Sequence, residues 1–233
     1  MNLLLFMMGG SGTRVGNILP KQYTIIKGKP LFYYTLEAYS KLNCIDKVII
    51  VSNKEYMKLA QENAIPVLRE KYFDVVPGGN TRLNSIKNGL IYARKQILDN
   101  DVVLIHDASN PFVASNEMPS FIETVEEYSA AAIGTNQYHT IYKRDMEDFI
   151  ICDIPRNTVG SGYSPEGFKF GILYDLLSKI DHENLLQMTS TVAIANFMGM
   201  KIKFIPANIL NLKITYKQDI EIYEKLLTES RRR

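Results

Sequence analysis

The fold of this chain is set by the stretch Leu3-Leu-Leu-Phe-Met-Met-Gly9-Gly-Ser-Gly12-Thr-Arg14-Val-Gly-Asn-Ile-Leu-Pro20-Lys21-Gln-Tyr23, in which an apolar strand runs into a glycine-rich loop. Glycines permit a tight turn whose backbone N–H groups meet one anion, and open α/β sheets bind ligands at the ends of their strands. Arg14 and Lys21 add two fixed cations. The pattern GxGxxG fails because Val15 stands at a glycine position, and GxxxxGK[ST] has no match. The loop therefore predicts a triphosphate site that is neither a Rossmann fingerprint nor a Walker A loop.

Apolar, β-branched runs alternate with segments of helical period along the rest of the chain. We predict strands at residues 3–8, 47–51, 102–105, 130–134 and 201–205, and helices at 31–42, 56–63, 81–98 and 220–227. Such alternation indicates a mostly parallel sheet with helices on both faces. Residues 136–166 interrupt it with a possible hairpin, 140–143 and 149–152, and a Gly/Ser/Pro-rich loop. We therefore expect a single Rossmann-like α/β domain, residues 1–233, with an inserted β-arm at 136–166.

The composition is that of an ordinary globular protein. Lys and Arg number 27 against 25 Asp and Glu, so the net charge of +2 implies no general attraction to nucleic acid or membrane. Cys44 and Cys152 form no CxxC motif and lie in apolar runs, which is typical of reduced core cysteines. The first apolar run is too short for a signal segment or a membrane span. We expect a cytoplasmic protein whose partners include neither nucleic acid nor membrane.

Four polar clusters follow apolar runs, at residues 9–21, 77–85, 106–113 and 211–215. Loops at the carboxyl ends of parallel strands converge on one crevice, so two glycine turns, Asp107, and the cations Arg14, Lys21 and Lys213 are expected to face a common ligand. Each cluster alone also has an ordinary structural interpretation, as a turn, a braced loop or a solvated charge. Their joint order is what points to a binding site.

That order contains several specific motifs. Residues 8–16 and 20–22 match AAGxGxRMG…PKQ, residues 78–85 match GGxxR…S, and residues 106–112 match HDAxRPF. Further matches are TIK at 140–143, a distal arginine at 156, TPQ-G-F at 164–168, the threonine of TD at 189 and NxK-[IV]-T at 211–215. In this the chain resembles, over nearly its whole length, the family of 2-C-methyl-D-erythritol 4-phosphate cytidylyltransferase and its ribitol-phosphate and glycerol-phosphate relatives.

The resemblance implies a reaction in which a phosphate oxygen of the acceptor attacks the α-phosphorus of CTP in line and expels pyrophosphate. Such a transfer depends on positioning and on electrostatic stabilisation of the developing charge. The implied catalytic residues are Arg14, Lys21, Lys213 and Asp107, and Asp107 would also hold Mg²⁺, for which one carboxylate suffices when phosphates complete the shell.

Further residues follow from the same resemblance. Nucleotide contacts are implied for Met8, Gly9, Gly10, Ser11, Gly12, Thr13, Gly79, Asn80, Arg82, Ser85 and Ala108. Acceptor contacts are implied for Asn110, Thr140, Arg156, Ser164 and Thr189. The expected assembly is a homodimer, in which the arm of one subunit brings Arg156 into the site of the other.

The chain departs from the motifs on the acceptor side. Asn110 replaces an arginine, Ser164 and Glu166 replace Thr and Gln of TPQ, and Ser190-Thr191 replace acidic residues. Losing a guanidinium loses a bidentate clamp that asparagine cannot imitate. We therefore favour glycerol phosphate or ribitol phosphate as acceptor, giving a CDP-polyol for a surface polysaccharide. Methylerythritol phosphate, in isoprenoid synthesis, is the alternative, and a non-catalytic nucleotide-binding module is the alternative of another class.

Two further features are interpreted as structural. His106 adjoins Asp107 but is expected to face the other way and to serve in packing. The motif Asp99-Asn-Asp101 matches the DxD of glycosyltransferases, yet it precedes its strand where a metal site would follow it. We interpret it as a polar turn.

Overall fold

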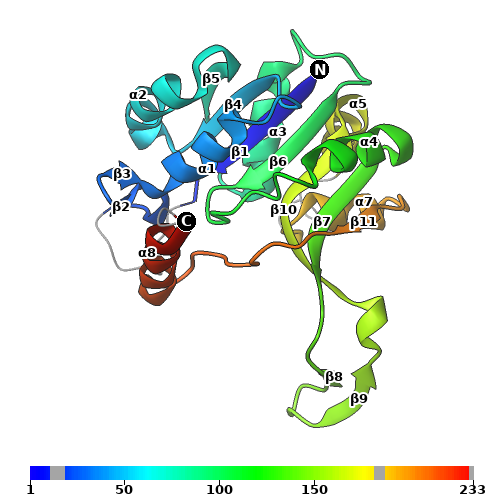
Figure 1. Cartoon of the computed structure of the whole chain (residues 1–233). Coiled ribbons are helices and arrows are strands. Elements are labelled where there is room, and N and C mark those ends of the chain that lie inside the picture. Colours follow the sequence, from blue (N-terminus) through cyan, green and yellow to red (C-terminus); the bar gives the residue numbers. More distant parts are fainter. Residues whose placement is uncertain (11–18, 181–186, 231–233) are drawn as a thin grey trace.

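The computed structural model describes residues 1–10, 19–180 and 187–230. Its centre is a seven-stranded sheet of order β11-β7-β10-β6-β1-β4-β5 (Figure 1). The strands are β1 (Asn2–Met8), β4 (Lys47–Ser52), β5 (Tyr72–Pro77), β6 (Val102–Asp107), β7 (Ala130–Asn136), β10 (Gly160–Lys169) and β11 (Lys203–Pro206). All ladders of this sheet are parallel except those of β10, which runs antiparallel to β6 and β7. The predicted fold class, one α/β domain with a mostly parallel sheet, is confirmed.

Helices cover both faces because the central strands are buried on both sides. Along β1, Leu4, Phe6 and Met8 belong to one core and Leu3, Leu5 and Met7 to the other, which is the period of two expected for a strand. The first core lies beneath α1 (Leu31–Ser40), α2 (Met57–Leu68) and α4 (Met118–Tyr128), and the second beneath α3 (Arg82–Ala93), α5 (Phe170–Lys179) and α7 (Thr191–Phe197).

A third, smaller core joins the last helix to the first loop region. α8 (Lys217–Ser230) contributes Ile220 and Tyr223, which pack with Ile26 of the small sheet β2 (Ile25–Ile26) and β3 (Lys29–Pro30) and with Tyr34 of α1. This contact holds the segment before α8 against the residues that follow the glycine-rich loop. No helix in the described part of the chain combines the length and apolarity that spanning a membrane requires.

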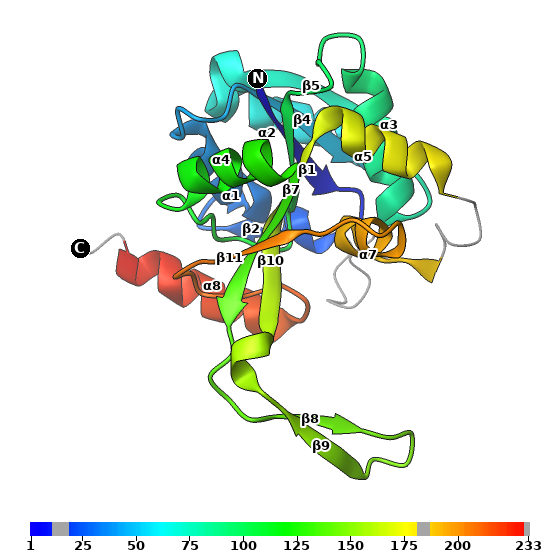
Figure 2. The same ribbon diagram turned by 90° about the vertical axis from the view of Figure 1, so that its right-hand side faces the viewer.

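The predicted hairpin is present as β8 (Ile141–Arg144) and β9 (Ile150–Ile154), a separate two-stranded sheet. It extends away from the body of the molecule (Figures 1 and 2). The expected arm of 136–166 was too long, because Gly160 to Glu166 belong to β10 in the main sheet. Cys152 on β9 is exposed, so the expectation of a core cysteine is wrong there, while Cys44 is partly buried.

No strand is predicted from the sequence of Gly160–Lys169, because glycine, serine and proline are poor strand formers. Its glycines are needed for close packing. A β-carbon on Gly167 would lie 2.6 Å from Cγ2 of Val125 on α4, and one on Gly160 would lie 2.5 Å from the Phe204 ring. The strand places Glu166 opposite Ile105, two residues before Asp107. A carboxylate therefore stands near the functional end of β6.

Candidate active site

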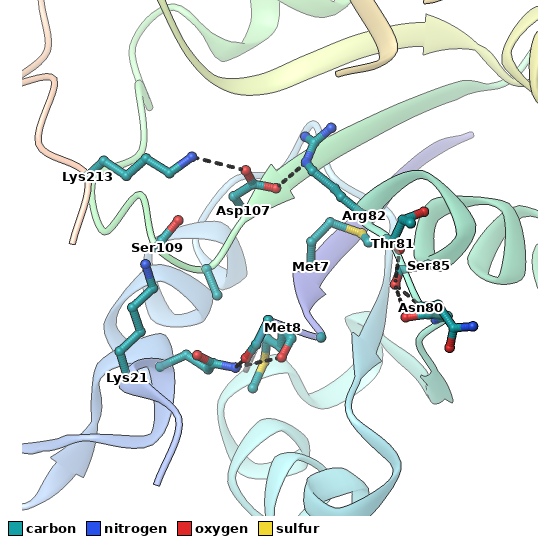
Figure 3. A pocket seen from close by; sticks show the side chains of 15 residues that line it. Met7, Met8, Lys21, Asn80, Thr81, Arg82, Ser85, Asp107, Ser109 and Lys213 are labelled. Atoms are coloured by element: carbon teal, nitrogen blue, oxygen red, sulfur yellow. Dashed lines mark hydrogen bonds and ion pairs between the residues drawn. The ribbon is translucent and has the colours of Figure 1, made fainter. Parts of the chain in front are cut away.

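A cleft of about 480 Å³ lies where β1, β5 and β6 end (Figure 3). It brings together residues from all four predicted clusters. Among the predicted site residues, those that line the cleft are Met8, Gly9, Gly10, Lys21, Gly79, Asn80, Arg82, Ser85, Asp107, Ala108 and Lys213. Arg14, Ser11, Gly12 and Thr13 lie outside the described residues. The described part of the predicted nucleotide site is thus one continuous surface.

Gln22 holds the entrance to the glycine-rich loop. Its buried side chain donates from Nε2 to the carbonyl oxygens of Met8 and Gly10, at 2.7 and 2.9 Å. Those bonds fix the end of β1 and the first residues after it, Gly9 and Gly10, at the edge of the cleft. Gln22 belongs to the motif at residues 20–22, from which no role was predicted for it. Its position directly after Lys21 was the available signal.

The turn after β5 forms a second wall. The Ser85 hydroxyl donates to the carbonyl of Thr81 at 2.8 Å and accepts from the N–H of Gly79 at 2.9 Å. A β-carbon on Gly79 would lie 2.7 Å from Cβ of Asn84, so glycine is needed for this close approach. The Thr81 hydroxyl caps α3 by accepting from the N–H of Asn84. The turn is therefore rigidly attached to the start of α3.

Asp107 lies between two cations (Figure 3). Arg82 donates from Nε to Oδ1 of Asp107 at 2.8 Å, and Nζ of Lys213 lies 3.6 Å from Oδ2. Burial alone would raise the pKa of Asp107, but Arg82 and then Lys213 hold it below its usual value. The carboxylate is ionised at neutral pH and presents negative charge in a cleft whose other charged groups are positive.

Lys21 and Lys213 approach the cleft from widely separated parts of the chain. Lys21 donates from Nζ to the carbonyl of Ile214, next to Lys213. The side chain of Lys213 is 56% exposed, so its ammonium group is accessible to a bound anion. Two ammonium groups and the Arg82 guanidinium therefore line one cleft, an arrangement suited to a triphosphate.

The residues behind Asp107 form a buried support. His106 is fully buried; its Nε2 lies 2.8 Å from the Asn110 carbonyl and its Nδ1 lies 2.8 Å from the Tyr39 hydroxyl. Burial lowers the pKa of His106 to about 4, so the ring is neutral at physiological pH. This agrees with the packing role expected for it. The DxD segment is also structural, since Asp101 accepts from the Leu98 N–H in a turn before β6.

The predicted acceptor residues are not gathered in this cleft. Asn110 and Ser164 are buried; Nδ2 of Asn110 donates to Oγ of Ser164 at 3.0 Å, and the same oxygen accepts from the Asp107 N–H at 3.2 Å. Thr140 and Arg156 lie on the arm, and Thr189 is exposed just before α7. Arg156 donates to the carbonyl of Tyr138 at 2.8 Å. Their contact with an acceptor stays a prediction.

The described residues contain no group of three or more His, Cys, Asp or Glu side chains that could hold a metal ion by themselves. Asp107 is the carboxylate that lines the cleft. Since Mg²⁺ retains waters and takes phosphate oxygens as ligands, one ionised carboxylate fits a metal shared with a nucleotide. The residues present are compatible with Mg²⁺ in that form.

Comparison with known proteins supports this chemistry. Residues 3–229 match the family model described as IspD: 2-C-methyl-D-erythritol 4-phosphate cytidylyltransferase. A protein of that name from Clostridium botulinum strain Eklund 17B is 34% identical over 223 residues, covering 96% of this chain and 97% of its own. The protein of that name from Clostridium beijerinckii is 30% identical over 220 residues, covering 94% and 95%.

Solved structures show the same fold. The 4-diphosphocytidyl-2C-methyl-D-erythritol synthase of Anaerococcus prevotii has a TM-score of 0.80 at 22% identity, covering 97% of this chain and 96% of its own. The 2-C-methyl-D-erythritol 4-phosphate cytidylyltransferase of Francisella tularensis has a TM-score of 0.76 at 21% identity, covering 96% and 98%. The family match also sets aside the alternative of a non-catalytic nucleotide-binding module. The chain belongs to the 2-C-methyl-D-erythritol 4-phosphate cytidylyltransferase family and is a CTP-dependent nucleotidyltransferase.

Proposed function

We propose that this enzyme transfers the cytidylyl group of CTP to 2-C-methyl-D-erythritol 4-phosphate. The geometry supports the nucleotide half through one observation, the cleft in which Lys21, Lys213 and Asp107 meet the glycine turns. The acceptor half is supported by the family match and by the names of the relatives, which agree over nearly the whole chain. These comparisons favour the alternative acceptor over glycerol phosphate or ribitol phosphate, and they conflict with a role in surface polysaccharide synthesis.

The surroundings of Asn110 do not favour a different acceptor. Asparagine in place of the arginine of the motif predicted the loss of a clamp on the acceptor. In the structure Asn110 is 5% exposed and bonded to Ser164, with its Oδ1 lacking a hydrogen-bond partner among the described residues. A buried amide that supports a neighbouring side chain carries little information about which polyol phosphate binds outside.

The proposed catalytic roles follow from charge and position. Lys21, Lys213 and, by resemblance, Arg14 would neutralise the triphosphate and the charge that develops as pyrophosphate leaves. The glycine turn at Gly79 and Ser85 would present backbone groups to the base. Asp107 would hold Mg²⁺, which supplies Lewis-acid neutralisation of phosphate oxygens when bound. The remaining contribution is alignment of the acceptor phosphate with the α-phosphorus.

We further propose a homodimer in which the arm completes the neighbouring subunit's acceptor site. Two observations support it. Arg156 lies on the arm and not among the residues of its own chain's cleft. The arm also exposes large apolar side chains, with Met146 100% and Tyr138 78% exposed, together with Tyr142, Phe149, Ile150 and Ile151. Such a surface is typical of a contact with another chain.

The acceptor is tested by measuring pyrophosphate release from CTP with methylerythritol phosphate, ribitol phosphate and glycerol phosphate. We expect kcat/KM for methylerythritol phosphate to exceed the others by at least about tenfold, which corresponds to roughly 1.4 kcal/mol of transition-state binding. Asp107→Asn serves as the inactive control. A wild-type enzyme that prefers ribitol or glycerol phosphate would contradict the proposed acceptor and leave the cytidylyltransferase assignment intact.

A further inference from the structure

Arg82 joins two carboxylates from different strands. Its Nε donates to Oδ1 of Asp107 at 2.8 Å, while its Nη1 and Nη2 lie 3.4 and 3.3 Å from Oε2 of Glu166. Its side chain is 25% exposed. Burial alone would lower the pKa of Arg82, but Glu166 and then Asp107 raise it above its usual value. The guanidinium is therefore a permanent cation that is shared between a cleft carboxylate and one beside the cleft.

Glu166 is itself held in place. Its side chain is 13% exposed, and the hydroxyl of the buried Thr191 donates to the same Oε2 that faces Arg82. Glu166 does not line the cleft, whereas Arg82 does, so Glu166 contacts the guanidinium from outside the nucleotide site. Position 166 is also one where this chain carries a charge in place of the neutral glutamine of the motif that it matches.

The shared guanidinium creates a competition at Asp107. The carboxylate charge that Arg82 attracts through Oδ1 is the same charge that a hard cation held by Asp107 would use. A metal on Asp107 would share this carboxylate with Arg82, and a guanidinium whose carboxylate is drawn toward another cation is costly to keep in a partly buried site unless a second carboxylate is at hand. Glu166 already provides that second carboxylate.

We propose that Glu166 is a positioning residue, which shares the Arg82 guanidinium and so leaves more of the Asp107 carboxylate charge available to the Mg²⁺ of the nucleotide. This inference rests on the proposed use of Mg²⁺ and CTP at the site. In Glu166→Gln the guanidinium keeps Asp107 as its remaining ionic partner. The metal must then compete with the full attraction of Arg82, so the site binds it less tightly.

Thr191 offers a matched way to restore the charge. Its hydroxyl contacts Glu166, so an aspartate at 191 places a carboxylate beside residue 166 and within the same environment of Arg82. The double variant Glu166→Gln/Thr191→Asp therefore has the wild-type number of charges, with the carboxylate moved from position 166 to position 191. A purely steric role of Glu166 predicts no recovery in this double variant.

The test is Mn²⁺ binding to the full-length protein with CTP and no acceptor, followed by electron paramagnetic resonance with protein-free CTP as blank. We expect Glu166→Gln to weaken Mn²⁺ binding by roughly tenfold, the scale for removing one charge a few ångströms away. The half-saturating Mg²⁺ for pyrophosphate release should rise by a similar factor, with a smaller fall in kcat at saturating Mg²⁺. The double variant should recover most of both losses.

The variant Asp107→Asn distinguishes a failure of the positioning role of Glu166 from a failure of the metal assignment to Asp107. If Asp107→Asn loses Mn²⁺ binding while Glu166→Gln binds as tightly as wild type, the positioning role is wrong and the metal assignment stands. If Asp107→Asn also binds normally, the assignment of the metal to Asp107 is wrong, and the inference fails with it.

If circular dichroism shows that Glu166→Gln does not fold, Mn²⁺ binding is measured with Thr191→Val instead. This variant keeps the charges of Arg82, Asp107 and Glu166 and removes only the hydroxyl that orients Glu166. A smaller weakening of Mn²⁺ binding in the same direction supports the proposal, and unchanged binding overturns it.

Discussion

The ammonium group of Lys21 donates a hydrogen bond to the carbonyl of Ile214, a residue 193 positions further along the chain. This bond links the residues after the glycine-rich loop to the segment that carries Lys213. The packing of α8 against β2 and α1 supports the same link from outside the cleft. The ammonium groups of Lys21 and Lys213 are therefore placed by segments from near the start and near the end of the chain that contact each other.

Lys21→Ala should lower turnover by about two to three orders of magnitude, the effect of removing one preorganised charge from a developing anion. CTP binding should weaken less than turnover falls, because Lys21 would interact more strongly with the charge that develops on the leaving pyrophosphate in the transition state than with the bound nucleotide. Steady-state kcat and the KM for CTP are the measurements. The control is Lys58→Ala, whose side chain is 88% exposed on α2. Near-normal turnover at saturating CTP would remove Lys21 from the catalytic set.

Gly79→Ala should weaken CTP binding by at least about tenfold and destabilise the protein by roughly 1–3 kcal/mol, as overpacking usually does. The added β-carbon would lie 2.7 Å from Cβ of Asn84, so the turn must move and its bond to Ser85 must lengthen. Calorimetric CTP binding and thermal unfolding check both effects. Gly162→Ala is the control, because no atom lies within 4 Å of its added β-carbon. Equal behaviour of the two variants would contradict the close-packing argument.

The sequence predicted β1 and β6, two of the three strands that end at the cleft, because they are continuous apolar runs with polar residues at their ends, but it predicted no strand at β5. β1, β4 and β6 are such runs, and the topology then places their loops together. β10 was missed because its glycines act through contacts with Val125 and Phe204, which lie far away in sequence. No local pattern reports such contacts.

The site residues divide in the same way. Asp107, Lys21 and Lys213 could be named because charge at a strand end is visible in the sequence. The roles of Glu166 and Asn110 could not, since one depends on Arg82 from α3 and the other on Ser164 from β10. A departure from a motif shows that the surroundings of that residue differ from those in the family. Only the fold shows which neighbouring side chain the substituted residue contacts.

Arg156→Ala and Lys21→Ala should complement each other when the two variant proteins are mixed and allowed to exchange subunits. If Arg156 acts in the partner's site, a mixed dimer contains one site with both native residues and one with neither. Since half of the dimers in an equal mixture are mixed, about a quarter of wild-type activity should return. Each variant alone stays nearly inactive.

Subunit exchange has to be verified by native mass spectrometry, with one variant mass-labelled. Mixed dimers without any recovery of activity would place Arg156 in its own subunit's site or outside catalysis. A protein that is monomeric under these conditions would contradict the proposed composite site directly.

The fully buried His106 should make stability depend on pH below neutrality. Its pKa is lowered from 6.5 to about 4 by burial, so between these values the unfolded chain binds a proton that the native state excludes. Protonation of the unfolded chain therefore lowers the free energy of unfolding increasingly as the pH falls. Above about pH 6.5 His106 is neutral in both states and this loss of stability is absent. From pH 7 to pH 5 this group should remove about 2 kcal/mol from the free energy of unfolding.

Urea denaturation of wild type and His106→Gln at both pH values measures this contribution. Glutamine keeps an amide donor for the Asn110 carbonyl but cannot titrate, so the variant should lose less stability over the same interval. Carboxylates such as Asp107 titrate in both proteins and cancel in the comparison. An equal loss in the two proteins would show that His106 is not held neutral by burial, and that the support behind Asp107 tolerates a charged ring.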